Sequence, residues 1–213
     1  AKLLYPGGTE IEDRKQVDQI SHTLELLKQD EVTIYEATLQ FGDWVARMDV
    51  LKKAGNRVEL IDVKSKSFDS LAGDINEQWR PKRVNATKSG PHIKTPILPY
   101  LQDVAFQTLL ARQAFPDWEV VPYLMVVDKA VKASVDGLNQ MFKIYRVGQG
   151  ADQRTHARAQ PGVTPDSIGK PVLKAIDVTD FVNEIIESTV QTPGGDQFFK
   201  DAATEWARAY ASE

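Results

Sequence analysis

The fold is decided by residues 44–64, which read WVARMDVLKKAGNRVELIDVK. Runs rich in β-forming residues flank a Gly-Asn pair, which is typical of two strands joined by a tight hairpin. A two-residue loop pairs Ala54 with Arg57. Counting back along the ladder then places Asp49 directly opposite Asp62, on the same face and with Cβ atoms roughly 4.5–5.5 Å apart. A loop of odd length would place the two acids on opposite faces instead.

Two carboxylates facing each other repel unless a cation lies between them or one of them is protonated. Mg²⁺ or Mn²⁺ is the hard divalent cation that suits a pair of oxygen ligands. Lys64 follows Asp62 by two residues on the same face, roughly 6.6 Å along the strand, where it can contact a metal-bound water or a phosphate. Two acids, a lysine and a divalent metal suit the hydrolysis of a phosphodiester bond.

Hydrophobic periodicity and turn residues predict the other elements. In chain order they are a helix at about 15–29 with Val17, Ile20, Leu24 and Leu27 on one stripe, a strand at 33–40, the hairpin strands at 44–53 and 57–65, a helix at 101–115, strands at 118–127, 142–147 and 172–176, and helices at about 178–190 and 196–211. A loop insertion at about 68–99 and a polar loop at about 148–171 interrupt this order. The order predicts a single α/β domain over residues 1–213, with a mixed central sheet flanked by helices.

Composition excludes several classes of protein. The 213 residues contain no cysteine, which excludes disulfides, cysteine-ligated zinc and iron–sulfur clusters from this sequence. The net charge of −4 argues against a purely electrostatic nucleic-acid binder, although a local acidic metal site is compatible with it. We find no membrane-spanning stretch and no signal peptide, so we expect a cytoplasmic protein without a membrane partner. Because residues 1–5 read like the tail of an element, we expect a fragment of a longer protein.

Asp49, followed thirteen residues later by Asp62-Val63-Lys64, resembles the signature of the PD-(D/E)XK nuclease superfamily. The apolar run before Asp62 is most similar to the RecB-like branch, which includes the CRISPR-associated exonucleases. Residues 100–107 resemble the glutamine motif of that branch, and residues 35–37 resemble a related uncharacterised bacterial family within it. The resemblance implies a restriction-endonuclease-like core and metal-dependent, exonuclease-like hydrolysis of DNA at single-stranded or free ends.

The resemblance also implies roles for individual residues. The metal ligands for Mg²⁺ or Mn²⁺ would be Asp49, Asp62 and the backbone carbonyl of Val63. The catalytic lysine would be Lys64, with Gln107 near the metal or the scissile strand. The groups that support the ligands would be Glu36 and Asp103, the latter one helical turn before Gln107. The residues that contact DNA would be Arg47, Tyr100, Arg80, Lys82 and Arg83.

Simpler interpretations stay open. Asp49 and Asp62 could be strand-end charges on a solvated face, Gln107 a plain helix residue, and the basic stretch at 80–88 an insertion without DNA contact. We interpret Lys66 as a solvated lysine. The alternative function is a nuclease-fold module that binds nucleic acid or a protein partner without cutting, and a third is a metal-dependent hydrolase of a small phosphoester.

Overall fold

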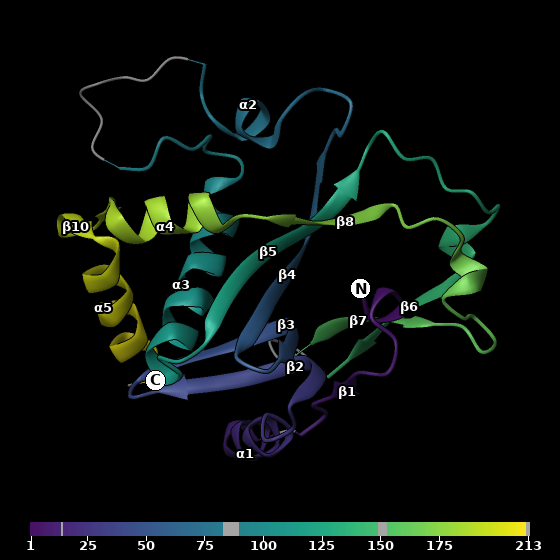
Figure 1. Ribbon diagram of the computed structural model, residues 1–213, viewed down its shortest axis with the longest axis horizontal. Helices are drawn as coiled ribbons and strands as arrows, with labels where there is room; N and C mark the ends of the chain where they lie inside the picture. Colours follow the sequence, from purple (N-terminus) through teal and green to yellow (C-terminus); the bar gives the residue numbers. More distant parts are fainter. Residues whose placement is uncertain (14, 83–89, 149–152, 212–213) are drawn as a thin grey trace.

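A six-stranded mixed sheet forms the centre of the protein in the computed structural model, which describes residues 1–13, 15–82, 90–148 and 153–211, and of 154–156 only the backbone (Figure 1). In spatial order its strands are β1 (Thr9–Glu10), β2 (Glu31–Phe41), β3 (Trp44–Ala54), β4 (Arg57–Phe68), β5 (Glu119–Asp128) and β8 (Leu173–Asp177). β2, β3 and β4 form an antiparallel meander, β5 runs parallel to β4, and β1 runs parallel to β2. β8 closes the sheet antiparallel to β5. The predicted α/β class with a mixed sheet is confirmed.

Glycines set the two hairpins of the meander. The β2–β3 and β3–β4 loops are both two residues long, and each begins with a glycine at positive φ, +58° at Gly42 and +60° at Gly55. A two-residue hairpin loop with positive φ at its first position favours glycine there, because glycine has no Cβ to clash. The second loop pairs Ala54 with Arg57, which confirms the predicted register.

Side chains from five helices contribute to the main core. The helices are α1 (Gln16–Leu26), α2 (Ile75–Trp79), α3 (Leu98–Ala114), α4 (Thr179–Glu187) and α5 (Phe199–Ala211). Leu60 and Leu124 of the sheet are fully buried in this core together with Leu101 and Leu110 of α3. Fully burying a leucine side chain stabilises the fold by about 1.5–3 kcal/mol. A smaller apolar cluster lies apart from it, centred on Tyr35, Val50, Ile61 and Met125, with residues of the N-terminal segment packed against it.

The predicted loop at 68–99 contains more structure than its proline and glycine content indicates. β4 continues to Phe68, the first residue of this segment, α2 lies within the segment, and α3 begins at Leu98. Trp79, Ile93 and Ile97 are buried, with exposed fractions of 6–7%. These apolar side chains join the main core, so the segment folds back onto the domain.

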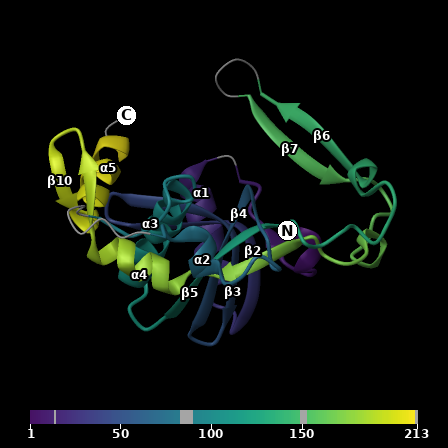
Figure 2. The ribbon, with the colours of Figure 1, turned by 90° about the horizontal axis from the view of Figure 1, so that it is seen from above.

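The predicted polar loop at 148–171 is wrong over residues 154–159, because they form a strand, β7 (Arg154–Ala159). β7 pairs antiparallel with β6 (Phe142–Val147), whose bounds match the prediction but which lies outside the central sheet. The two strands form a ribbon that stands away from the body of the molecule (Figure 2). β7 reads RTHARA, without the large apolar residues that mark a strand in sequence, so cross-strand pairing alone defines it. Short 3₁₀ helices, η2 (Leu138–Met141) and η4 (Asp166–Ile168), lie on either side of the ribbon in the chain.

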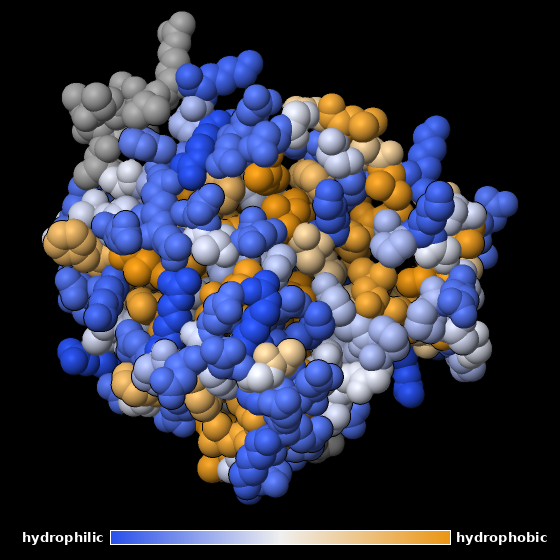
Figure 3. Space-filling model, viewed as in Figure 1, coloured by the Kyte–Doolittle hydropathy of each residue, from blue (hydrophilic) through white to orange (hydrophobic). Residues whose placement is uncertain are grey.

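The remaining elements are short. A 3₁₀ helix, η1 (Lys2–Leu4), opens the chain. A small hairpin of β9 (Thr189–Thr192) and β10 (Gly195–Phe198) lies between α4 and α5, and its second strand takes the first residues of the helix predicted at 196–211. Figure 3 shows a mostly hydrophilic face with apolar residues in scattered groups. None of the helices in the described ranges is long and apolar enough to cross a membrane.

Candidate functional site

Asp49 lies where β3 and β4 separate. The ladder between these strands runs from Ala54 and Arg57 to Val50 and Ile61, so Asp49 and Asp62 are the next residues in register. Past that point a side-chain contact replaces the backbone ladder. The backbone N–H of Val63 donates to Asp49 Oδ2 at 2.7 Å. The two acids therefore occupy the first positions past the end of the ladder, and the direct pairing that the hairpin register predicts for them is not part of it.

The carboxylate of Asp62 is buried, with an exposed fraction of 4% for the residue. Gln107 Nε2 donates to its Oδ1 at 3.5 Å, and Lys64 Nζ forms an ion pair with its Oδ2 at 3.1 Å. Among the described residues, Oδ2 has no hydrogen-bond partner. Burial raises the pKa of Asp62, Lys64 offsets only part of the rise, and the charge of Asp49 adds to it. A buried carboxylate oxygen in this state is a group that a bound cation would satisfy.

Lys64 lies between two carboxylates. Its Nζ is 3.1 Å from Asp62 Oδ2 and 3.4 Å from Asp103 Oδ2. Burial acts to lower the pKa of Lys64, but the two carboxylates outweigh it and the net shift is upward. Lys64 is therefore a cation at neutral pH, which suits donation to a phosphate oxygen or a water. Asp103 and Gln107 reach the site from successive turns of α3, as their i, i+4 spacing predicts.

Glu36 is strained. It lies within β2 at φ +59°, and it is the only non-glycine residue in the described ranges with positive φ. The β2–β3 ladder is paired on both sides of Glu36 but not at Glu36 itself, which lies level with Asp49. Such backbone outliers cluster at functional sites. Its carboxylate accepts Arg47 Nε at 2.8 Å, so a contact between Arg47 and DNA would have to share that ion pair.

The charge of Asp49 also reaches Glu36. Burial raises the pKa of Glu36, Arg47 opposes the rise, and Asp49 adds to it. The three acids Glu36, Asp49 and Asp62 thus come from one level of three neighbouring strands. Their mutual repulsion indicates a site where negative charge is concentrated.

The donors available to a divalent ion at this level are the carboxylates of Asp49 and Asp62, with the Val63 carbonyl as a predicted third. Within the described ranges, no three His, Asp or Glu side chains form a group that could hold a metal ion by themselves. Mg²⁺ usually keeps several waters and is held by one or two carboxylates together with substrate phosphates. The two acids fit that mode of binding, in which the ion would share the buried Asp62 Oδ2 with Lys64.

Lys66 is a site residue that the sequence did not reveal. Its Nζ lies 5.1 Å from the centre of the Tyr100 ring, and Lys64 Nζ lies 6.0 Å from the same centre. Tyr100 is in the first turn of α3 and half-buried. The predicted motif ends at Lys64, but in the structure Lys66 and Lys64 lie over the same Tyr100 ring, in the part of β4 where its register against β5 shifts. Together the three side chains form a cationic and aromatic ledge beside the acids.

The other predicted DNA contacts lie elsewhere. Arg80 donates to the Glu184 carboxylate, and its guanidinium lies 4.6 Å from the centre of the Phe181 ring, so it anchors the segment after α2 to α4. Lys82 is exposed, and Arg83 lies outside the described residues. DNA contact by these residues stays a prediction.

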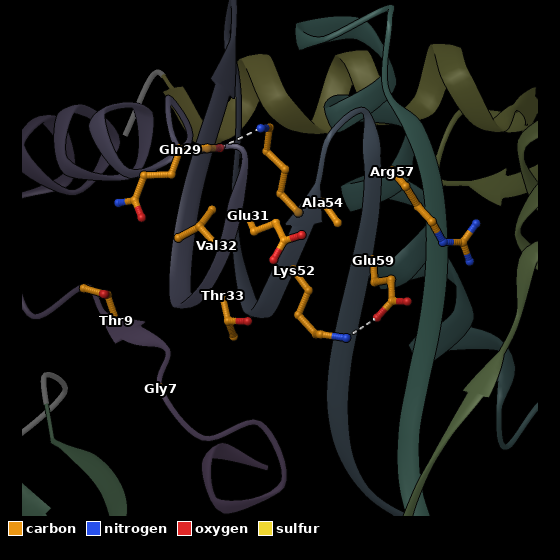
Figure 4. Close-up of a pocket in the computed structure, with 11 residues that line it drawn as sticks. Gly7, Thr9, Gln29, Glu31, Val32, Thr33, Lys52, Ala54, Arg57 and Glu59 are labelled. Carbon is orange, nitrogen blue, oxygen red and sulfur yellow. Dashed lines mark hydrogen bonds and ion pairs between the residues drawn. The ribbon is translucent and has the colours of Figure 1, made fainter.

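A surface pocket of about 370 Å³ lies apart from the acids (Figure 4). Strands β2, β3 and β4 line one side of it and the loop around Gly7 the other. Lys52 Nζ contacts Glu59 Oε2 at 2.7 Å, and Lys53 Nζ donates to the Gln29 carbonyl at 2.7 Å. The ammonium groups of Lys52 and Lys53 are therefore engaged within the protein. Asp49, Asp62 and Lys64 are not among the residues that line this pocket.

Comparison of the chain with protein-family models, curated proteins and solved structures finds no match. The candidate site therefore rests on the geometry of Asp49, Asp62, Lys64 and Gln107.

Proposed function

We propose that this chain is a divalent-metal-dependent nuclease that hydrolyses phosphodiester bonds of DNA in an exonuclease-like manner. The observation that carries the proposal is the buried Asp62 carboxylate. Its Oδ2 forms an ion pair with Lys64 and finds no hydrogen-bond partner in the part of the chain that the structure describes, and Asp62 lies level with Asp49 one step past the end of the β3–β4 ladder. The chain order of α1, β2–β4, α3 and β5 supports a restriction-endonuclease-like core, with the acids on the central hairpin and the glutamine on the following helix.

In this proposal Asp49 and Asp62 hold Mg²⁺ or Mn²⁺, and the Val63 carbonyl completes the protein ligands. The bound ion supplies an activated water and stabilises charge on the phosphate. Lys64 stays protonated and donates to the phosphate or orients the attacking water. Gln107 holds Asp62 Oδ1 through its amide, which fixes the carboxylate.

Two further groups position this machinery. Asp103 forms a second ion pair with Lys64, at 3.4 Å. Glu36 stands beside Asp49 and keeps Arg47 next to the acids. Both act through other residues, so their loss should lower the rate without abolishing it.

The test is a cleavage assay with end-labelled linear DNA, circular DNA and RNA, in Mg²⁺, in Mn²⁺ and in EDTA. Asp62→Asn and Lys64→Ala should abolish cleavage while Lys28→Ala, which removes an exposed lysine of the α1 end, should cleave like wild type. Exonuclease-like action predicts that circular DNA resists. Wild type that degrades none of these substrates with either metal, or variants that cleave as wild type does, would overturn the proposal in favour of a binding module.

A further inference from the structure

The β6–β7 ribbon carries a basic face. Lys143 pairs directly with Arg158 across the ribbon, so their side chains share one face, and both are exposed. Like charges directly opposite each other destabilise a strand pair. A bound anion between or above them would remove that repulsion, so the pair is a candidate anion contact.

The charge of the ribbon differs from that of the whole chain. Residues 142–160 contain four Lys and Arg residues and one acid, Asp152, while the chain as a whole has a net charge of −4. The ribbon also exposes apolar side chains, 70% of Ile144 and 52% of Val147. An isolated two-stranded ribbon is marginally stable in water. The positive charge of the ribbon favours a polyanionic partner. Its exposed apolar side chains favour a partner that also covers the strands.

The segment that carries the ribbon begins at the end of β5, the strand next to β4, which carries Asp62 and Lys64. The segment returns to β8, and its base is closed by the Asp128 N–H, which donates to the Val172 carbonyl at 2.8 Å. Asp128 pairs with Phe68 at the end of β4, and Asp62 lies earlier on that same strand. The ribbon is therefore rooted at the edge toward which the strand carrying Asp62 and Lys64 runs.

We propose that the β6–β7 ribbon is an arm that binds duplex DNA by entering its major groove, next to the end that the candidate site would cleave. The inference rests on the proposed nuclease function for its choice of partner. The major groove is about 12 Å wide and admits a two-stranded ribbon, whereas a single strand offers no groove. Lys143 and Arg158 face phosphates, and Val147 on the same face meets apolar groups in the groove.

Binding is measured in EDTA, so that cleavage plays no part, by fluorescence anisotropy of a labelled duplex of about 20 base pairs, two helical turns, and of one of its strands. The test variant is Lys143→Glu/Arg158→Glu. The control, Lys28→Glu/Lys200→Glu, changes the net charge equally at exposed lysines far from the ribbon in sequence. Thermal melting verifies that both variants fold, which is expected because all four side chains are exposed.

The expected result is at least a tenfold loss of duplex affinity in the ribbon variant and less than a twofold loss in the control, with a salt slope lower by about 1.8 for two lost phosphate contacts. An equal loss in both variants would overturn the proposal, as would an equal loss for duplex and single strand. Ribbon-dependent duplex binding without any cleavage by wild type would overturn the nuclease function and leave the arm standing. Cleavage by wild type with duplex binding unchanged in the ribbon variant would overturn the arm alone.

Discussion

Replacing Asp62 by asparagine should stabilise the metal-free protein. The wild-type carboxylate is 4% exposed and has an oxygen without a hydrogen-bond partner among the described residues. A buried polar group left unsatisfied costs about 1–3 kcal/mol, and the nearby Lys64 recovers part of that cost. We therefore expect the free energy of unfolding of Asp62→Asn to exceed that of wild type by about 1 kcal/mol at neutral pH, or about 2–4 °C in Tm for a chain of this length.

The pH dependence of this difference has a definite sign. Burial raises the pKa of Asp62 above its ordinary value of 3.8, so the folded protein binds the proton more tightly than the unfolded chain. The contribution of Asp62 to the stability of wild type therefore falls as the pH rises from 3.8 through the raised pKa, and Asp62→Asn lacks this contribution. The stability difference should be near zero below that range, grow through it and become constant above it. Urea titrations of both proteins at several pH values measure this difference.

Divalent metal should reverse the order of stability. An ion that binds only the folded protein adds about 2.7 kcal/mol at a concentration 100-fold above its dissociation constant. For a chain of this size this is about 5–10 °C in Tm. Melting curves with and without Mg²⁺ or Mn²⁺ should show this gain in wild type and little of it in Asp62→Asn. Equal stabilisation of the two proteins by metal, or a metal-free variant less stable than wild type by more than about 2 kcal/mol, would refute the role given to Asp62.

Three further substitutions test the surroundings of the site. Glu36→Gly should change the free energy of unfolding by less than about 1 kcal/mol in a urea titration. Glycine relieves the left-handed backbone, and the loss of the half-exposed ion pair with Arg47 offsets that gain. A loss above about 2 kcal/mol would contradict the strain at Glu36. Lys66→Ala should lower the salt slope of DNA binding by about 0.9, measured by anisotropy in EDTA, and an unchanged slope would remove Lys66 from the interface. Leu110→Ala, at a fully buried position of α3, should destabilise the protein by about 2–5 kcal/mol in the same urea titration, and a smaller effect would mean that α3 packs loosely.

The hairpin register could be predicted because it depends on local rules. The side chains of a strand alternate strictly, so the loop length alone determines which residues face each other, and a two-residue loop left a single choice. The structure has the predicted pairing of Ala54 with Arg57. The predicted neighbours Asp49 and Asp62 follow from that pairing without any knowledge of the rest of the chain.

The buried face of α1 could not be predicted in the same way. Of the predicted stripe, Leu27 at the end of the helix is buried in the main core, but Val17 and Leu24 are 65% and 44% exposed, and the buried residue within the helix is Thr23. The Thr23 hydroxyl accepts the Thr38 N–H at 3.0 Å, so a polar contact with β2 sets the orientation of the helix. Periodicity reports which positions share a face, whereas the neighbouring strand decides which face is covered.

The departures from local rules lie at one level of the sheet, that of Glu36, Asp49 and Asp62. Elsewhere in the meander the β2–β3 and β3–β4 ladders are continuous, and β4 shifts its register against β5 only after Val63. At this level Glu36 has a left-handed backbone within a strand, the β3–β4 ladder stops beside Asp49, and Asp62 buries a charge with an oxygen that lacks a hydrogen-bond partner in the described part of the chain. Each departure costs stability, and sequences that fold consistently retain such costs mainly where a function needs them. Because the three lie on adjacent strands, one shared requirement explains them more simply than three separate ones, and a cation that binds the acids is such a requirement.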